Sequence, residues 1–254
     1  MNLSSIAIKL LLLLIVAVLF DSCAPVYMTP GNNTITRVPT TVYRIPSYIT
    51  EYTLVGLTHK SDLIVRGRIT GSEGIVNMAR DVNDYSKPDP KLFGIGQIYG
   101  FAVTQRIKAS GSELSGEEIK IIQVEGLIYS PSTNPPSQEA IEAAKTPVRG
   151  SPLIKNQEYI LFLKLTREFD DLKGYYTGTA HPWQFIIEKG CAYPETPWEM
   201  VVNFYQPQET EKFVADVKAS MNVKETPQPK WSYPVPGSAK SPCPPRGKAE
   251  APYP

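Results

Sequence analysis

Histidine and cysteine are scarce in this sequence, and neither sign of charge dominates. The 254 residues include two histidines and three cysteines, and the formal net charge is +1 at pH 7. So few ligating side chains argue against a histidine-rich metal centre and against a disulfide-dense scaffold. A net charge near zero supplies no strong field that would draw the chain to nucleic acid or to anionic lipid. We therefore expect no metal, no cofactor and no nucleic-acid partner.

Motifs of the common nucleotide-binding and hydrolytic sites are also missing. No G-x-S-x-G and no G-x-x-x-x-G-K-[ST] occurs, and the glycines of residues 94–100 (GIGQIYG) precede no predicted helix. A loop with Asp81, Asn83 and Asp84 offers oxygen ligands for a weak Ca²⁺ site, but solvated loop carboxylates are the simpler interpretation. We therefore expect a protein without catalysis.

Proline, in contrast, is abundant, and its distribution separates a central domain from the two ends of the chain. Many of the 24 prolines lie near the two ends, whereas the hydrophobic residues, 42% of the total, suffice for one globular domain. Proline-rich segments of low hydrophobicity pack poorly. We predict four parts: a signal peptide (1–22), an extended spacer (23–49), a β-barrel domain with a C-terminal helix (50–222) and a disordered proline-rich tail (223–254).

The N-terminus resembles a bacterial lipoprotein signal. Lys9 precedes an apolar core from Leu10 to Phe20, and Ser22 then leads into Cys23. In such signals, diacylglycerol is attached to the cysteine sulfur and a peptidase cuts before the cysteine. The resemblance implies a lipid on Cys23, which would hold the protein on the cell membrane or outer membrane, facing outside the cytoplasm, because two acyl chains give stable attachment. An ordinary signal-peptide cut and an uncleaved anchor are the alternatives, and the charge of Asp21 favours them.

The middle of the chain alternates as β-strands do. The strongest segment, residues 156–166, is apolar on both faces, as a central strand requires. The first segment is expected to end at Gly71 and Gly74. Long polar loops are expected over 77–96 and 127–150. The predicted strands lie within 62–74, 97–110, 119–126, 156–166, 173–180 and 182–190.

Three helices flank these strands in the prediction. A short helix is expected after Glu51, and another within 137–145, with Ser137 as its N-cap. The third, within 207–221, has apolar residues at helical spacing, acidic residues early and lysine later. Five or six strands with flanking helices predict a mainly β, α+β domain, and we expect a small OB-like β-barrel.

The core resembles a family of bacterial secreted β-domains that are similar to the OB-like barrels of netrins and tissue inhibitors of metalloproteases. Asn156 stands where that pattern usually has glycine. The family's inhibitors act through a free N-terminal cysteine amine, and a lipidated Cys23 far from the barrel would not provide one, so we do not expect protease inhibition. The matching positions are Ser61, Asp62, Gly67, Lys108, Tyr159, Phe162 and Leu163.

Candidate site residues are few. Trp183, with His181, Tyr175 and Tyr176, could form an aromatic groove for a sugar or a planar group, and an aromatic edge of the core is the alternative interpretation. His59, just before a strand, is expected at the surface. The four basic residues of two predicted strands are too few for a nucleic-acid groove in a chain of near-zero charge. These four are Arg66, Arg68, Arg106 and Lys108.

Two cysteines remain besides Cys23. In an oxidising compartment Cys191 and Cys243 could form a disulfide that fixes the tail to the barrel, and otherwise Cys243 would be an exposed thiol.

Three functional hypotheses follow. The first is a membrane-anchored extracytoplasmic module that binds a protein or glycan and catalyses nothing. The second is an extracytoplasmic hydrolase that uses His181 with loop carboxylates. The third is a purely structural envelope component.

Overall fold

The structure is a computed structural model that describes residues 50–110, 117–129, 131–145, 152–196, 204–224 and 242–246. The predicted signal peptide, Cys23 and the spacer lie outside the described residues, as does most of the predicted tail. Within the described part, no helix is long and apolar enough to cross a membrane.

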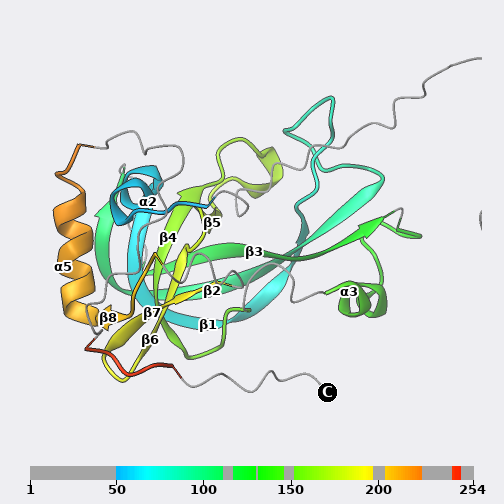
Figure 1. The fold of residues 1–254 in the computed structure, drawn as a ribbon. Helices are drawn as coiled ribbons and strands as arrows, with labels where there is room; N and C mark the ends of the chain where they lie inside the picture. Colours follow the sequence, from blue (N-terminus) through cyan, green and yellow to red (C-terminus); the bar gives the residue numbers. More distant parts are fainter. Residues whose placement is uncertain are drawn as a thin grey trace, which may run out of the picture. The chain divides into compact units, whose positions relative to one another are not determined.

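Eight strands form one sheet, and three α-helices accompany it in the described part of the chain (Figure 1). The prediction of a mainly β, α+β domain is therefore confirmed. The strands are β1 (Leu63–Asn77), β2 (Leu92–Ala109), β3 (Glu118–Tyr129), β4 (Glu158–Leu165), β5 (Tyr176–Gly178), β6 (Gln184–Glu188), β7 (Cys191–Glu195) and β8 (Gln208–Glu209). The helices are α2 (Leu54–Lys60), α3 (Gln138–Ala144) and α5 (Thr210–Ser220), and a short 3₁₀ helix, η3, covers Asp170–Leu172.

Five of the strands form a ring of pairings. The order of the sheet is β1-β2-β3-β5-β4-β6-β7-β8, and β1 also pairs with β4. The pairings within the ring are antiparallel, except that β3 and β5 run parallel. Strands β6, β7 and β8 continue the sheet from β4 as an antiparallel extension.

The first strand is longer than predicted. We expected it to end at Gly71 and Gly74, but β1 continues to Asn77 and pairs with β2 along its whole length. Irregular register steps at Ile69/Gly71 and Ser72/Gly74 accommodate the two glycines. Glycines in a strand often mark such bulges, which bend the strand without ending it.

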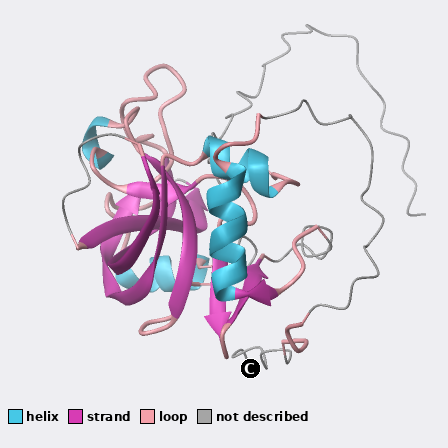
Figure 2. Ribbon diagram, turned by 90° about the vertical axis from the view of Figure 1, so that its left-hand side faces the viewer, coloured by secondary structure: helices cyan, strands magenta, loops and turns pink. Residues whose placement is uncertain are grey.

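The helices occur where the sequence predicts them. Ser137 caps α3, since its side chain accepts a hydrogen bond from Ala140 N. Helix α5 runs beside the strands (Figure 2), and its Phe213 packs on the contacting sheet residues Phe162 and Phe185, at centroid distances of 6.3 and 4.6 Å. Both faces of β4 are buried in the main hydrophobic core, and α5 covers part of one of them, which accounts for the apolar residues on both faces.

The motif residues of the sequence resemblance organise the end of α2. Asp62 accepts a hydrogen bond from Leu165 N at 3.0 Å, which joins the start of β1 to the end of β4. Lys108 Nζ donates to the carbonyls of Thr58 and Ser61, at 2.8 and 2.6 Å. These are terminal carbonyls that the helix itself leaves without partners. The motif is therefore structural.

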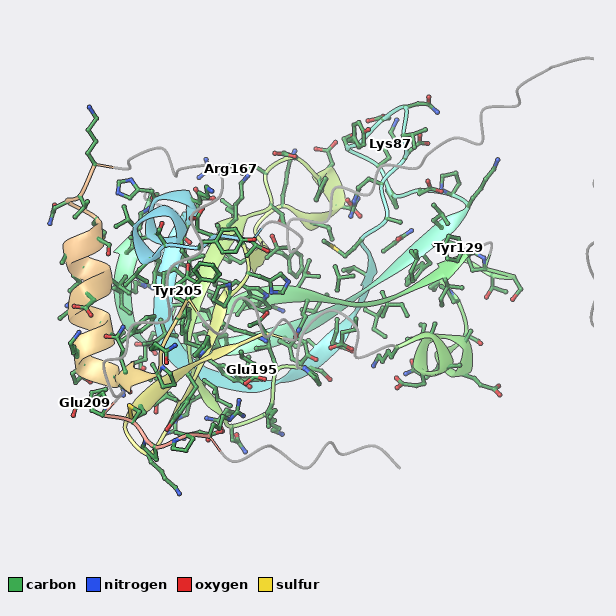
Figure 3. The ribbon with its side chains drawn as sticks, in the orientation of Figure 1. Lys87, Tyr129, Arg167, Glu195, Tyr205 and Glu209 are labelled. Carbon is green, nitrogen blue, oxygen red and sulfur yellow. A yellow bond between two sulfur atoms is a disulfide. The ribbon has the colours of Figure 1, made fainter. Side chains whose placement is uncertain are left out.

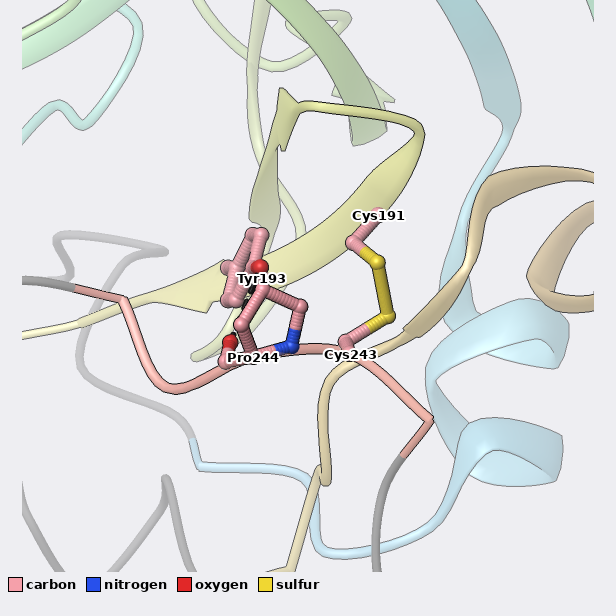
Figure 4. The surroundings of a disulfide bond; sticks show 4 residues. All are labelled: Cys191, Tyr193, Cys243 and Pro244. Atoms are coloured by element: carbon pink, nitrogen blue, oxygen red, sulfur yellow. Dashed lines mark hydrogen bonds between the residues drawn. A yellow bond between two sulfur atoms is a disulfide. The ribbon is translucent and has the colours of Figure 1, made fainter.

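A C-terminal segment, residues 242–246, lies against the β6–β7 hairpin (Figure 4). Cys243 forms a disulfide with Cys191, as one of the two sequence interpretations predicted. Tyr193 Oη donates to Pro244 O at 3.0 Å, and Arg246 pairs with Glu188 and Glu195. The prediction of a disordered tail is therefore wrong for residues 242–246, because a covalent bond and two ion pairs fix this segment to the domain.

Candidate binding face

Two loops on the same side of the ring come together, and they form the best candidate for a binding face. We call residues 78–91, between β1 and β2, the β1–β2 loop, and residues 166–175, between β4 and β5, the β4–β5 loop. Lys87 and Arg167, one from each loop, are labelled in Figure 3.

The β1–β2 loop is fixed at its base by the last residue of β1. The Asn77 side-chain amide donates to Leu92 O at 2.9 Å, and its Oδ1 accepts from Ala79 N and Gly94 N, both at 2.9 Å. One side chain thus closes both ends of the loop. A loop held this way loses little further conformational entropy when a partner binds.

Arg80 joins the β1–β2 loop to the β4–β5 loop. Its Nη1 donates to Asp171 Oδ1 at 2.6 Å, and its Nη2 donates to Asn77 O at 2.8 Å. The guanidinium carbon lies 4.4 Å from the centroid of the Phe169 ring, a cation–π contact. The Arg80 side chain is 5% exposed, whereas that of Asp171 is 38% exposed. The ion pair therefore has a buried cation and an anion that solvent reaches.

An apolar cluster lies beneath the two loops. It combines residues of β2 and β3 with one residue of the first loop and two of the second, so both loops pack on the sheet. Gly96 permits this packing, because a side chain there would collide with Met78 and Ile122. The cluster consists of Met78, Ile98, Ile122, Val124, Phe169 and Leu172.

The β4–β5 loop is also braced internally. Thr166 N donates to Tyr175 O at 2.9 Å, and the buried Thr166 hydroxyl contacts the carbonyls of Leu172 and Tyr175. These contacts hold the first and last residues of the loop together. Both loops are thus ordered before any partner arrives.

The tip of the β1–β2 loop presents apolar and aromatic surface. Val82 is 42% exposed and Tyr85 is 46% exposed. Asp84 stabilises the turn at this tip. Its carboxylate accepts hydrogen bonds from Ser86 N and Oγ and forms an ion pair with Lys87 at 2.7 Å. The hydrogen bond from Lys87 is the main cause that lowers the pKa of Asp84 to about 2. The tip is a hydrogen-bonded turn that carries two exposed hydrophobic side chains.

The described residues around this turn do not support the Ca²⁺ site considered from the sequence. Asp81 Oδ1 accepts from Asn83 N at 2.8 Å, so this acid, like Asp84, serves the turn. Among the described residues, no three His, Cys, Asp or Glu side chains come together as a metal group.

The predicted aromatic groove is not a surface feature. His181 and Trp183 are 2% exposed and Tyr176 is 6% exposed, and Tyr175 packs on the cluster beneath the loops. The alternative interpretation, an aromatic part of the core, is the correct one. Burial lowers the pKa of His181 to about 4, so its imidazole is neutral at pH 7.

The other singled-out polar residues have structural contacts. The His59 ring Nε2 lies 3.2 Å from Ser220 O and thereby links α2 to the end of α5. Arg66 pairs with Glu158 and Glu211, each at 2.7 Å, and Arg68 lies 3.6 Å from Glu158. Neighbouring carboxylates thus neutralise the positive charges of these two arginines, which the sequence placed on one strand.

Comparisons with protein-family models and with curated proteins find no match to this chain. The candidate binding face therefore rests on geometry alone. Sequence reasoning missed it, because its central pair, Arg80 and Asp171, is separated by 91 positions. The abundance of turn-forming residues in 77–96 was the one local signal, and it indicated a loop without indicating what the loop contacts.

Proposed function

We propose that this protein is an extracytoplasmic lipoprotein, anchored through Cys23, whose domain binds a partner protein through the two joined loops and has no catalytic activity. The observation that carries the proposal is the Arg80–Asp171 connection, which holds two loops in fixed positions and leaves Val82 and Tyr85 facing outward. Rigid loops that present aromatic and apolar side chains are common binding surfaces, because little conformational entropy is lost on binding.

The disulfide supports the proposed compartment. Disulfides persist in oxidising environments outside the cytoplasm, and Cys191–Cys243 fixes the C-terminal segment to β7. The chain has three cysteines, so this pair leaves Cys23 without another cysteine in the chain to pair with. A cysteine at the end of a signal-like apolar segment is then suited to carry lipid.

The ring of pairings supports an OB-like barrel of the netrin and tissue-inhibitor type. Five strands, closed by the β1–β4 pairing and with one parallel neighbour pair, would wrap around the buried side chains of the core. Such a barrel would set the two joined loops at one end of its β2–β3 face. The hydrolase hypothesis is not carried further, because His181 is buried in the core.

Site-specific photo-crosslinking in the native host tests this proposal. A benzophenone amino acid placed at Tyr85 should give one dominant protein adduct in intact cells. The same amino acid at Val223, which is 48% exposed just after α5 and away from the two loops, is the control and should give none. Equal adducts at both positions, no adduct at Tyr85, or capture of a glycan there would contradict the proposal of a protein partner at the loops.

A further inference from the structure

The C-terminal segment 242–246 lies on the face of the β6–β7 hairpin that α5 does not cover. Tyr193 of β7 pairs with Ile186 of β6, so both side chains lie on one face of the sheet. The neighbouring Phe185 lies on the other face, where it packs on Phe213 of α5. Because Tyr193 donates a hydrogen bond to the segment, the segment and α5 cover opposite faces of the hairpin.

Three alternate residues of β7 contact this segment, each in a different way. Alternate side chains of a strand share a face, so one row of β7 makes all three contacts. The contacts are the disulfide Cys191–Cys243 and the hydrogen bond from Tyr193 Oη to Pro244 O at 3.0 Å, both drawn in Figure 4, and the ion pair of Glu195 with Arg246. They follow the same order along both segments, so residues 242–246 run alongside β7 in the same direction.

Two of these contacts do not need the disulfide, and the stronger one is made by Arg246. Its Nε donates to Glu188 Oε1 at 3.0 Å, and its Nη1 donates to Glu195. The Arg246 side chain is 25% exposed and that of Glu195 is 14% exposed, so solvent screens the pair only in part. Charge-assisted hydrogen bonds from one guanidinium to two carboxylates fix both the position and the orientation of the segment.

The composition of the segment suits non-covalent docking. Three of its five residues are prolines, Pro242, Pro244 and Pro245. Proline fixes the backbone angle φ, so an extended proline-rich segment loses little conformational entropy when it binds. Aromatic side chains that receive such segments are a recurring mode of peptide recognition, and here Tyr193 has that position.

We propose that the β6–β7 hairpin is a recognition site for a proline-rich segment that ends in arginine, and that residues 242–246 dock there before the disulfide forms. Docking brings the Cys243 thiol to Cys191 and thereby selects this pair among the three cysteines of the chain. The occupant is the chain's own segment, since the contacts are made within one chain. The inference is independent of the proposed loop face.

The test measures the equilibrium between reduced and oxidised full-length protein in glutathione buffers. One glutathione disulfide is reduced to two thiols for each Cys191–Cys243 bond that forms, so the equilibrium constant reports the effective concentration of one cysteine at the other. R246Q removes the ion pairs, and Y193F removes the hydrogen bond. K189Q is the matched control, because it removes the same charge from an exposed lysine in the turn of the same hairpin.

The effective concentration should fall about tenfold or more in R246Q and about fivefold in Y193F, because each variant loses a contact that holds the reduced segment in place. K189Q should stay within about twofold of the wild type. The inference is overturned if R246Q and Y193F also stay within that range, if K189Q falls as far as R246Q, or if the oxidised protein is a disulfide-linked dimer.

Alkylation of the reduced protein tests docking in the absence of the bond. Cys243 is 5% exposed in the docked segment, so iodoacetamide should modify it about tenfold or more slowly in the folded, reduced wild type than in concentrated urea. In folded R246Q the rate should approach that in urea. Equal rates in the folded and unfolded wild type would overturn the inference, and this comparison needs no variant.

Discussion

At the scale of single residues, many polar side chains in the described part of the chain bind backbone groups. Lys108 is a clear case. Its ammonium group lies within 3.4 Å of three backbone carbonyl oxygens at the C-terminal end of α2, those of Thr58, His59 and Ser61. Burial lowers the pKa of Lys108, and the charge of Asp62 opposes that effect. The sequence resemblance identified both residues but could not reveal this role, because the carbonyls belong to the backbone of another segment.

Replacing Lys108 with methionine should therefore destabilise the domain. The substitution keeps the apolar stem but leaves the carbonyls at the end of α2 without their donor, which costs about 1 to 3 kcal/mol in the free energy of unfolding. Urea denaturation measures the effect. Lys164→Met, at an exposed position of β4, is the control and should change stability by less than about 0.5 kcal/mol. Equal losses in both variants would contradict the capping role.

His181 should make stability depend on pH. Its pKa is lowered to about 4 in the folded state, below the ordinary value of 6.5, because the ring is buried. Between these two values the unfolded chain binds a proton that the folded protein does not. The free energy of unfolding should therefore fall as the pH drops from 6.5 to 4, by roughly 3 kcal/mol at most.

The control is His181→Gln, which lacks the titrating ring. Urea denaturation of both proteins across pH 4 to 7 isolates the contribution of the histidine as the difference between the two curves. A difference that does not change with pH would show that the imidazole titrates normally in the folded state.

At the scale of elements, the sequence predicted most strands and all three described helices, but not the lengths of the strands. Alternation of apolar residues located β1, β3 and β4, because each buries at least one face. It did not locate β7 and β8, which have five and two residues and contain Pro194 and a pair of polar residues. Short extensions of a sheet are defined by their neighbours rather than by their own pattern.

The glycines of β1 show why its end could not be predicted. Gly67 is required by packing, since a methyl group there would overlap the carbonyl oxygen of Ala102 on β2 and the ring of Phe101. Gly71 lies in open space, with no atom within 4 Å of where a methyl group would be. Residue type alone does not distinguish these two situations, and neither glycine ends the strand.

Two matched variants test this difference. Gly67→Ala should lower the free energy of unfolding by about 2 to 3 kcal/mol, because backbone must move to admit the methyl group. Gly71→Ala, on the same strand, should change it by no more than about 0.5 kcal/mol. Thermal and urea denaturation report both values. A Gly71→Ala loss as large as that of Gly67→Ala would mean that the packing of β1 on β2 differs from that described.

At the scale of the whole molecule, the decisive contacts join positions far apart in the sequence. The disulfide links residues 52 positions apart, and it fixes a segment that composition alone assigned to a disordered tail. Closing a loop of that length stabilises the folded state by about 4 kcal/mol in the chain-entropy account. From the sequence, a Cys191–Cys243 disulfide and an exposed Cys243 thiol were both possible. The position of β7 beside residues 242–246 decides for the disulfide.

We propose that the protein works outside the cytoplasm, held to a membrane through Cys23. The most direct test is the intact mass of the protein purified from its native host without reductant, beside a Cys23→Ala variant. We expect a chain that begins at Cys23 and carries at least two acyl chains, which are absent from the variant. We also expect a gain of about 2 Da on reduction, because the Cys191–Cys243 bond takes up two hydrogens. A chain without lipid, or one that retains residues 1–22, would contradict the claim.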